Sequence, residues 1–270
     1  MTRVRPYVES WGRGRPILLV HGFGATTYTW RYLVPALSER HRVILIDLKG
    51  SGRSPKPVDD RYSVYDQAEM LSAFIVEEGL DDLTLVGHSL GGGVALAATL
   101  ALGHERRRLA RLILIDTVAY RQRFPAFIRL LRAPVLGPLV LWLVPATLQV
   151  STILRFAYHN PSKVTRGAIE VYAGPLRSPE ARHTLIRTAR EIIPRDVDAF
   201  VQSYASIELP TLIVWGRDDP VVPLEVGDKL HRAIRGSKLV VIGECGHLPH
   251  EERPAEVVKL TCAFLHGTEG

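Results

Sequence analysis

Short apolar runs recur along the chain, and helical patterns fill most of the intervals between them. Six runs are rich in Val, Ile and Leu, at residues 17–20, 43–48, 83–87, 111–118, 211–215 and 238–242. Near-continuous apolar runs of this length are typical of central strands in a parallel sheet that is covered on both faces. Residues 4–11 predict one further strand at an edge of the sheet.

The intervals carry helix signals. Apolar residues that begin at Trp30 and recur at i+3, i+4 and i+7 predict one buried helical stripe over residues 30–37. Ser63 and Asp66 match a capping box at the start of the next helix, and Pro254 is placed to open the last one. The alternation of strands and helices predicts an α/β fold with a mostly parallel, doubly wound sheet.

The alternation stops once, over residues 119–206. This segment has no convincing strand, and eight prolines divide it into helical pieces. It is too apolar to be disordered and too long to be a simple loop. We therefore predict a helical cap at 119–206, inserted between a first part of the core, residues 1–118, and a second part, residues 207–270.

The segment GHSLG at 87–91 lies between a predicted strand and a helix of small residues. A G-x-S-x-G motif at a strand-to-helix turn indicates a nucleophile elbow. The turn would expose the hydroxyl of Ser89, and the flanking glycines would let the strand and the helix approach each other closely. We expect His88 to pack behind the serine.

A serine nucleophile needs a base, and His247 is the candidate. It follows the last predicted strand, so its loop reaches the edge of the sheet where Ser89 lies. The segment WGRDDP at 215–220 offers two carboxylates for the acid that would pair with this base. We favour Asp219 over Asp116, which ends a predicted strand at the same edge, and place Asp218 last because it could instead brace the turn.

The segment HGFG at 21–24 and the cap supply the other site candidates. Glycines after a strand let a backbone N–H point at an oxyanion, so we expect the N–H groups of Phe23 and Leu90 to form the oxyanion hole. The predicted substrate pocket is apolar and consists of Leu139, Trp142, Leu143 and Leu248. The alternative, that these cap residues only bury the cap on the core, stays open.

Five segments together resemble the capped α/β-hydrolase superfamily of cofactor-independent hydrolases. They are HGFG at 21–24, DLKGSGRSPKP at 47–57, GHSLGGG at 87–93, WGRDDPVVP at 215–223 and GECGHLPHEERP at 243–254. The resemblance implies Ser89 as nucleophile, Asp219 as acid and His247 as base. It implies no cofactor. The His, Cys and carboxylate residues have no spacing that fits a metal site better than they fit the nucleophile, acid and base roles.

Details of the motifs narrow the activity. Haloalkane dehalogenases and related epoxide hydrolases carry Asp at the elbow, where this chain has Ser89. The carbon–carbon hydrolases of meta-cleavage products typically carry Asn before the nucleophile and Trp after the base, where this chain has His88 and Leu248. GHSLGG is more similar to esterases and monoacylglycerol-type lipases, and perhydrolases share the three roles. We expect hydrolysis of a small apolar ester, with carbon–carbon hydrolysis or lipase action as the alternative enzyme activities. The alternative outside the enzymes is a non-catalytic ligand sensor.

Charge and cysteine content add weaker constraints. The net charge is +6, and the arginine run at 106–111 has no interleaved aromatic residues, which favours a solvated helix end over a nucleic-acid surface. Cys245 and Cys262 are too few for a disulfide scaffold and fit a cytoplasmic location, although one bridge stays open. Residues 1–11 show no secretory signal. A homo-oligomer is compatible with the sequence.

The uncharged stretch 133–154 is long enough to span a membrane. Pro134, Gly137, Pro138 and Pro145 interrupt it, and hydrolase motifs lie on both sides. We therefore expect cap helices here and no stable membrane span.

Overall fold

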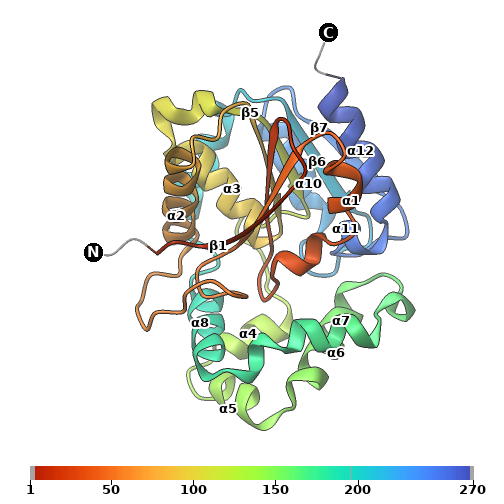
Figure 1. Ribbon diagram of the computed structural model, residues 1–270. Helices are drawn as coiled ribbons and strands as arrows, with labels where there is room; N and C mark the ends of the chain where they lie inside the picture. Colours follow the sequence, from red (N-terminus) through yellow and green to blue (C-terminus); the bar gives the residue numbers. More distant parts are fainter. Residues whose placement is uncertain (1–3, 195, 268–270) are drawn as a thin grey trace.

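The computed structural model describes residues 4–194 and 196–267, and these residues form one seven-stranded sheet (Figure 1). The strand order is β1-β3-β2-β4-β5-β6-β7, parallel throughout except for the antiparallel edge strand β1. The strands are β1 (Tyr7–Trp11), β2 (Pro16–Val20), β3 (Arg42–Asp47), β4 (Leu83–His88), β5 (Leu109–Ile115), β6 (Thr211–Gly216) and β7 (Lys238–Ile242). The predicted α/β fold and its edge strand are thus confirmed.

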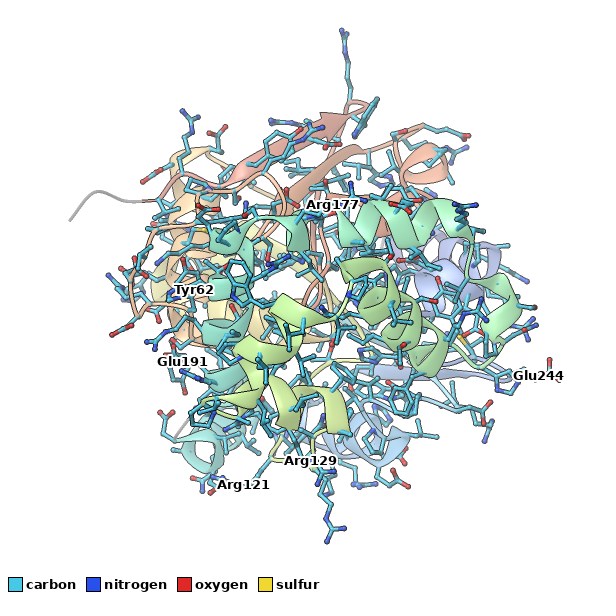
Figure 2. All side chains as sticks on the ribbon, turned by 90° about the horizontal axis from the view of Figure 1, so that it is seen from below. Tyr62, Arg121, Arg129, Arg177, Glu191 and Glu244 are labelled. Atoms are coloured by element: carbon cyan, nitrogen blue, oxygen red, sulfur yellow. The ribbon has the colours of Figure 1, made fainter. Side chains whose placement is uncertain are left out.

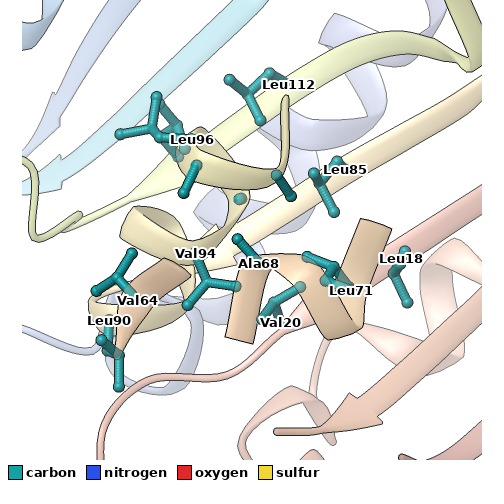
Figure 3. Packing of buried hydrophobic residues seen from close by; sticks show 14 of the residues in the cluster. Leu18, Val20, Val64, Ala68, Leu71, Leu85, Leu90, Val94, Leu96 and Leu112 are labelled. Atoms are coloured by element: carbon teal, nitrogen blue, oxygen red, sulfur yellow. The ribbon is translucent and has the colours of Figure 1, made fainter. Parts of the chain in front are cut away.

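Helices cover both faces of the sheet. One face carries α2 (Val64–Glu77), α3 (Leu90–Ala101) and α10 (Leu224–Ala233), and the other carries η1 (Thr27–Trp30), α1 (Val34–Leu37) and α12 (Pro254–His266). Figure 3 shows the first layer, where Ala68 of α2 and Val94 of α3 pack over strand residues such as Leu85. Such two-sided burial explains why the central strands have so few polar residues.

Local signals account for several helix boundaries. The Ser63 side chain accepts a hydrogen bond from Asp66 N at 3.1 Å, and the Asp66 side chain accepts one from Ser63 N at 3.1 Å, so the capping box of α2 is present. The stripe predicted as one helix over 30–37 is instead divided between η1, which ends at Trp30, and α1, which begins at Val34. Trp30 and Leu37 are nevertheless fully buried.

Residues 119–206, which we call the cap, contain helices and no strand in the part that the structure describes. The elements are α4 (Ala126–Arg132), α5 (Leu136–Leu143), α6 (Ala146–Ala157), η3 (Pro161–Lys163), α7 (Arg166–Ala173), η4 (Pro175–Arg177), α8 (Pro179–Arg190), α9 (Val197–Gln202) and η5 (Ser203–Ser206). In Figure 1 helices α4 to α8 lie below the sheet, at the end opposite the C-terminus. The three-segment division with borders at 118 and 206 stays a prediction.

The uncharged stretch 133–154 forms α5 and the first part of α6, with a break at Pro145. No single helix among the described residues is long and apolar enough to cross a bilayer, and α4 and α5 reach the required length and composition only as a pair bent by 108°. The first three residues of the segment judged for a secretory signal lie outside the described residues. The arginine run at 106–111 begins in η2 (Gly103–Arg108), at the amino end of β5.

Glu251, in the short helix α11 (Pro249–Glu252), joins the core to the cap. Its carboxylate accepts hydrogen bonds from Thr29 (2.7 Å), Arg31 (2.6 Å), Tyr158 (3.0 Å) and Tyr172. Burial would raise the pKa of Glu251, but the Arg31 guanidinium and the hydrogen bonds to the carboxylate hold this pKa below its usual value. Because Tyr158 and Tyr172 belong to the cap, one buried charge fixes the two layers to each other.

Glu252 makes a second connection, to the backbone. Its carboxylate accepts hydrogen bonds from the N–H groups of His159 at 3.0 Å and Asn160 at 2.7 Å, just after α6. It also accepts one from Gly246 N at 2.9 Å, in the loop after β7. Three backbone donors thus converge on one buried carboxylate and hold the end of α6 against this loop.

Candidate active site

Ser89 lies in a strained turn between β4 and α3. Its φ of 53° falls in the left-handed region, where a residue with a side chain is rare. A Cβ on Gly91 would lie 2.3 Å from Val20 O, and one on Gly87 would lie 2.5 Å from Gly91 O. The motif therefore needs glycine at both positions, and the predicted elbow is the geometry that the structure has.

The three predicted residues meet at the carboxyl edge of the sheet. His247 Nε2 lies 2.9 Å from Ser89 Oγ, and His247 Nδ1 lies 2.7 Å from Asp219 Oδ2. Asp219 Oδ1 accepts hydrogen bonds from the N–H groups of Val221 at 2.7 Å and Val222 at 3.0 Å, which fix its orientation. All three side chains are buried. The serine O–H can donate to an imidazole whose other N–H is held by a carboxylate.

The two competing acids have other partners. Asp116 ends β5 and accepts a hydrogen bond from Gly216 N at 3.0 Å. Burial and the nearby charge of Asp219 raise its pKa well above the usual range, which favours the neutral form of Asp116. Asp218 points to the surface, where it lies 3.0 Å from His159 Nδ1 of the cap. Of the three candidates, only Asp219 contacts His247 in the part of the chain described.

The loop that carries His247 is fixed from two sides. His247 N donates to Ala157 O at 2.7 Å, at the end of α6, and a Cβ on Gly246 would lie 2.2 Å from the same oxygen. On the core side, His88 Nε2 donates to His247 O at 2.8 Å. Burial, followed by the charges of His250 and His247, lowers the pKa of His88 well below its usual value, so this ring is neutral. His88 was expected only to pack behind the serine; the structure adds this hydrogen bond.

The predicted oxyanion donors have free N–H groups. Neither Phe23 N nor Leu90 N donates a hydrogen bond within the described residues. Phe23 follows Gly22, whose Cα lies so close to the elbow that a Cβ there would be 3.0 Å from Ser89 Cβ. Leu90 directly follows Ser89 at the start of α3, where the helix dipole favours negative charge. Both donors are therefore available beside Ser89.

A cavity of about 440 Å³ lies between the elbow and the cap, with Ser89 and His247 in its wall. Aliphatic and aromatic side chains form most of the lining, among them Ile128 of α4, Val140 of α5 and Leu154 of α6. Among residues 4–194 and 196–267, no Asp, Glu, Lys or Arg lines it. The site can therefore hold an uncharged apolar molecule next to the serine.

The predicted pocket residues are only partly correct. Leu248 lines the cavity, as expected. Leu139, Trp142 and Leu143 do not, and they are 47%, 62% and 71% exposed on the outer side of α5. Helix α5 is apolar on every side, so its sequence gives no polar face to show which side faces the core. Val140 and Leu141 occupy the cavity side instead.

Asp116, Asp219 and His247 are also the group of possible metal ligands found among the described residues, with ligand atoms within 4.8 Å of one another. Side-chain hydrogen bonds account for this proximity, since His247 donates to Asp219 and the side chain of Asp116 interacts with that of Asp219. A neutral Asp116 is also a poor ligand for a cation.

Sequence comparison agrees with this geometry. The model of the alpha/beta hydrolase family matches residues 17–260, which include every motif described above. The chain belongs to the alpha/beta hydrolase family. The family and its structural neighbours support hydrolase activity for this alpha/beta hydrolase.

Individual relatives differ in the activity that their names state. The 2-hydroxy-6-oxo-2,4-heptadienoate hydrolase of Pseudomonas putida is 30% identical over 264 residues, which cover 94% of this chain and 90% of that protein. An alpha/beta hydrolase fold protein from Burkholderia ambifaria has a TM-score of 0.84 at 27% identity, covering 97% of each chain. A thermophilic esterase from Thermogutta terrifontis has a TM-score of 0.79 at 27% identity, covering 98% of this chain and 94% of that chain. Membership of the alpha/beta hydrolase family therefore leaves the substrate open.

Proposed function

We propose that this alpha/beta hydrolase cleaves carboxylic esters of uncharged, apolar substrates through an acyl-enzyme on Ser89. One observation carries the proposal: the hydrogen-bonded series Ser89, His247 and Asp219 ends on an apolar cavity of about 440 Å³, and no Asp, Glu, Lys or Arg lines the described part of it. The geometry supports a nucleophile with its base, and the cavity supports the class of substrate.

The reaction follows from the positions of the three groups. As Ser89 Oγ attacks the ester carbonyl carbon, His247 Nε2 takes the hydroxyl proton and Asp219 stabilises the imidazolium. The bond to the leaving oxygen then breaks, and that oxygen takes the proton back from His247. Water attacks the acyl-enzyme with the same proton transfers, which releases the carboxylic acid and restores Ser89.

The tetrahedral intermediate carries a negative oxygen, and we assign its stabilisation to the N–H groups of Phe23 and Leu90. Both lie beside Ser89 without another acceptor in the described part of the chain. Each such donor typically lowers the barrier by about 2.7–4 kcal/mol, because it is aimed before the charge develops.

The lining also argues against the carbon–carbon alternative. The substrate named for the Pseudomonas putida relative is a dienoate, which carries a carboxylate. A carboxylate that enters an apolar cavity needs a polar or cationic partner to offset its lost hydration. The described lining of the cavity offers no Lys or Arg. Neutral esters fit it without an unpaired charge.

A series of p-nitrophenyl esters tests the proposal. We expect kcat/KM to rise from acetate to octanoate, because longer acyl chains bury more apolar surface in the cavity. A fluorophosphonate probe should label the wild type at Ser89. The Ser89→Ala variant should lose at least about 10⁴-fold in kcat while keeping its circular dichroism spectrum.

The matched control is Ser206→Ala, an exposed serine at the end of η5, which should keep full activity. Undiminished ester turnover by Ser89→Ala would refute the proposed nucleophile. Cleavage of 2-hydroxy-6-oxo-dienoates can be measured by their loss of colour. If it were faster than cleavage of any ester, it would refute the proposed bond type.

A further inference from the structure

The outer side of the cap exposes apolar side chains that the core does not use. Helix α5 and the segments beside it carry six exposed large apolar side chains, which we call the cap face. It consists of Val135, Leu136, Leu139, Trp142, Leu143 and Leu148, with exposures between 47% and 74%. Large apolar side chains gathered this way on a solvent-exposed surface indicate a site that contacts an apolar partner.

The charge around the cap face has a single sign. Residues 117–169 contain seven Lys and Arg and no Asp or Glu, whereas the rest of the chain has 27 Lys and Arg against 28 Asp and Glu. The whole net charge of the protein therefore originates in the segment that bears the apolar face. Figure 2 looks onto this side of the molecule, with Arg121 and Arg129 at its margin.

Four arginines of the cap lie close to the cap face in sequence or in space. The Arg182 guanidinium stacks 4.7 Å from the Trp142 ring, Arg132 stacks on Phe124, and Arg129 and Arg155 are exposed on α4 and α6. None of these four arginines forms an ion pair with another described residue, so their charges are available to an external anion. Arginine pairs well with phosphate, for which it offers several N–H donors.

We propose that the cap face docks on an anionic phospholipid surface, with α5 lying in the plane of the interface. The apolar side chains would enter the boundary between headgroups and acyl chains, and the arginines would meet lipid phosphates. The helix need not span the bilayer, since an interfacial helix buries only one face. This docking goes beyond the proposed ester hydrolysis and does not depend on it.

A second copy of this chain fits the same face less well. Closed dimers are mostly twofold symmetric, so the same patch would meet itself and the arginines of one copy would face those of the other. Such like charges oppose association, whereas an anionic leaflet attracts every one of them. The charge pattern therefore selects the lipid surface as the occupant.

The cap face also adjoins the cavity beside Ser89. Leu148 lines that cavity and is 56% exposed, and Thr152, one turn further along α6, is both exposed and part of the lining. The cavity wall thus reaches the surface at the edge of the cap face. A docked molecule would hold this edge against the bilayer, where apolar substrates are concentrated.

Vesicle binding by the full-length Ser89→Ala variant tests the docking separately from catalysis. The probes are sedimented vesicles of pure phosphatidylcholine and of phosphatidylcholine with about 30% phosphatidylglycerol. We expect at least tenfold stronger binding to the anionic vesicles, and at least tenfold weaker binding when about 0.5 M NaCl screens the charges. Equal binding to both vesicles, or none to either, would overturn the proposal.

Two pairs of variants separate the apolar and the charged contributions. Leu139→Asp with Leu143→Asp should weaken binding at least tenfold, whereas Val58→Asp, an exposed valine of the core, should leave it unchanged. Arg129→Glu with Arg155→Glu should weaken binding to anionic vesicles at least tenfold, on the order of fivefold for each arginine removed. Arg107→Glu, 77% exposed at the amino end of β5, should not. A dimer that Leu143→Asp dissociates, without vesicle binding by the parent, would assign the face to a second copy.

Discussion

Asp219 and Asp116 lie next to each other in the site, yet their surroundings give them different roles. Asp219 accepts three hydrogen bonds, including the one from His247, as an ionised carboxylate does. Asp116 is fully buried and neutral, since burial and Asp219 raise its pKa. Only the ionised carboxylate can stabilise an imidazolium, so we assign the catalytic acid to Asp219.

Substitution by asparagine separates the two roles. Asp219→Asn should lower kcat for p-nitrophenyl butyrate by about 10⁴-fold, because the amide no longer holds the required tautomer of His247. Asp116→Asn should stay within about tenfold of the wild type, since an amide resembles a neutral carboxylic acid and asparagine tolerates the φ of 42°. The opposite order of losses would assign the acid to Asp116.

At the same scale, the sequence allowed Ser89, His247 and Asp219 to be predicted because each follows a recognisable strand and turn. Glu251 escaped prediction, because its partners Arg31 and Tyr172 are far away in the chain and only the fold brings them together. Leu139 and Trp142 were wrongly placed in the pocket, because hydrophobicity alone does not tell the inner side of an apolar helix from its outer side.

Among the elements, α11 determines how the cap is attached. Its Glu251 pairs with Arg31 in the core and with Tyr158 and Tyr172 in the cap, while Glu252 binds the backbone after α6. The strand and helix pattern predicted most boundaries of the core. Contacts between the cap and the core depend on single polar residues in irregular segments, and no periodicity reports them.

Removing one buried charge tests this attachment. Glu251→Gln should lower the free energy of unfolding by about 3–5 kcal/mol, because it breaks a buried pair and leaves Arg31 without its carboxylate. The control Glu244→Gln removes a carboxylate that is 79% exposed and pairs with Arg253 on the surface, so it should cost less than about 1 kcal/mol. Urea titration followed by tryptophan fluorescence measures both, and equal losses would contradict the role of Glu251.

Over the whole molecule, three buried histidines link stability to pH. Burial is the main cause that lowers the pKa of His21, His88 and His250, the last to about 4. The unfolded chain, with histidine pKa values near the usual 6.5, therefore binds more protons than the folded chain between about pH 6.5 and 4. Stability is full above this window and falls as the pH drops through it.

His88 and His250 should each cost about 1.4 kcal/mol of unfolding free energy between about pH 7.5 and 5.5, and His21 acts in the same direction. Urea titrations at the two pH values measure the sum. The variant His250→Asn should show a smaller fall, while His104→Asn, which changes an exposed ring, should reproduce that of the wild type. An unfolding free energy that is independent of pH over this range would contradict the neutral state of the three rings.

The hydrogen bond from His247 N to Ala157 O makes the end of α6 part of the frame that aims the imidazole. The cap helices before the end of α6 can therefore vary in evolution more freely than Ala157 and the residues that follow it. Consider a chimera that receives a cap segment from another member of the family. The donor segment should end before Ala157, so that the Ala157 carbonyl keeps its close approach to Gly246, where a Cβ would not fit. Substrate choice and proton transfer would then be inherited separately, one from each parent.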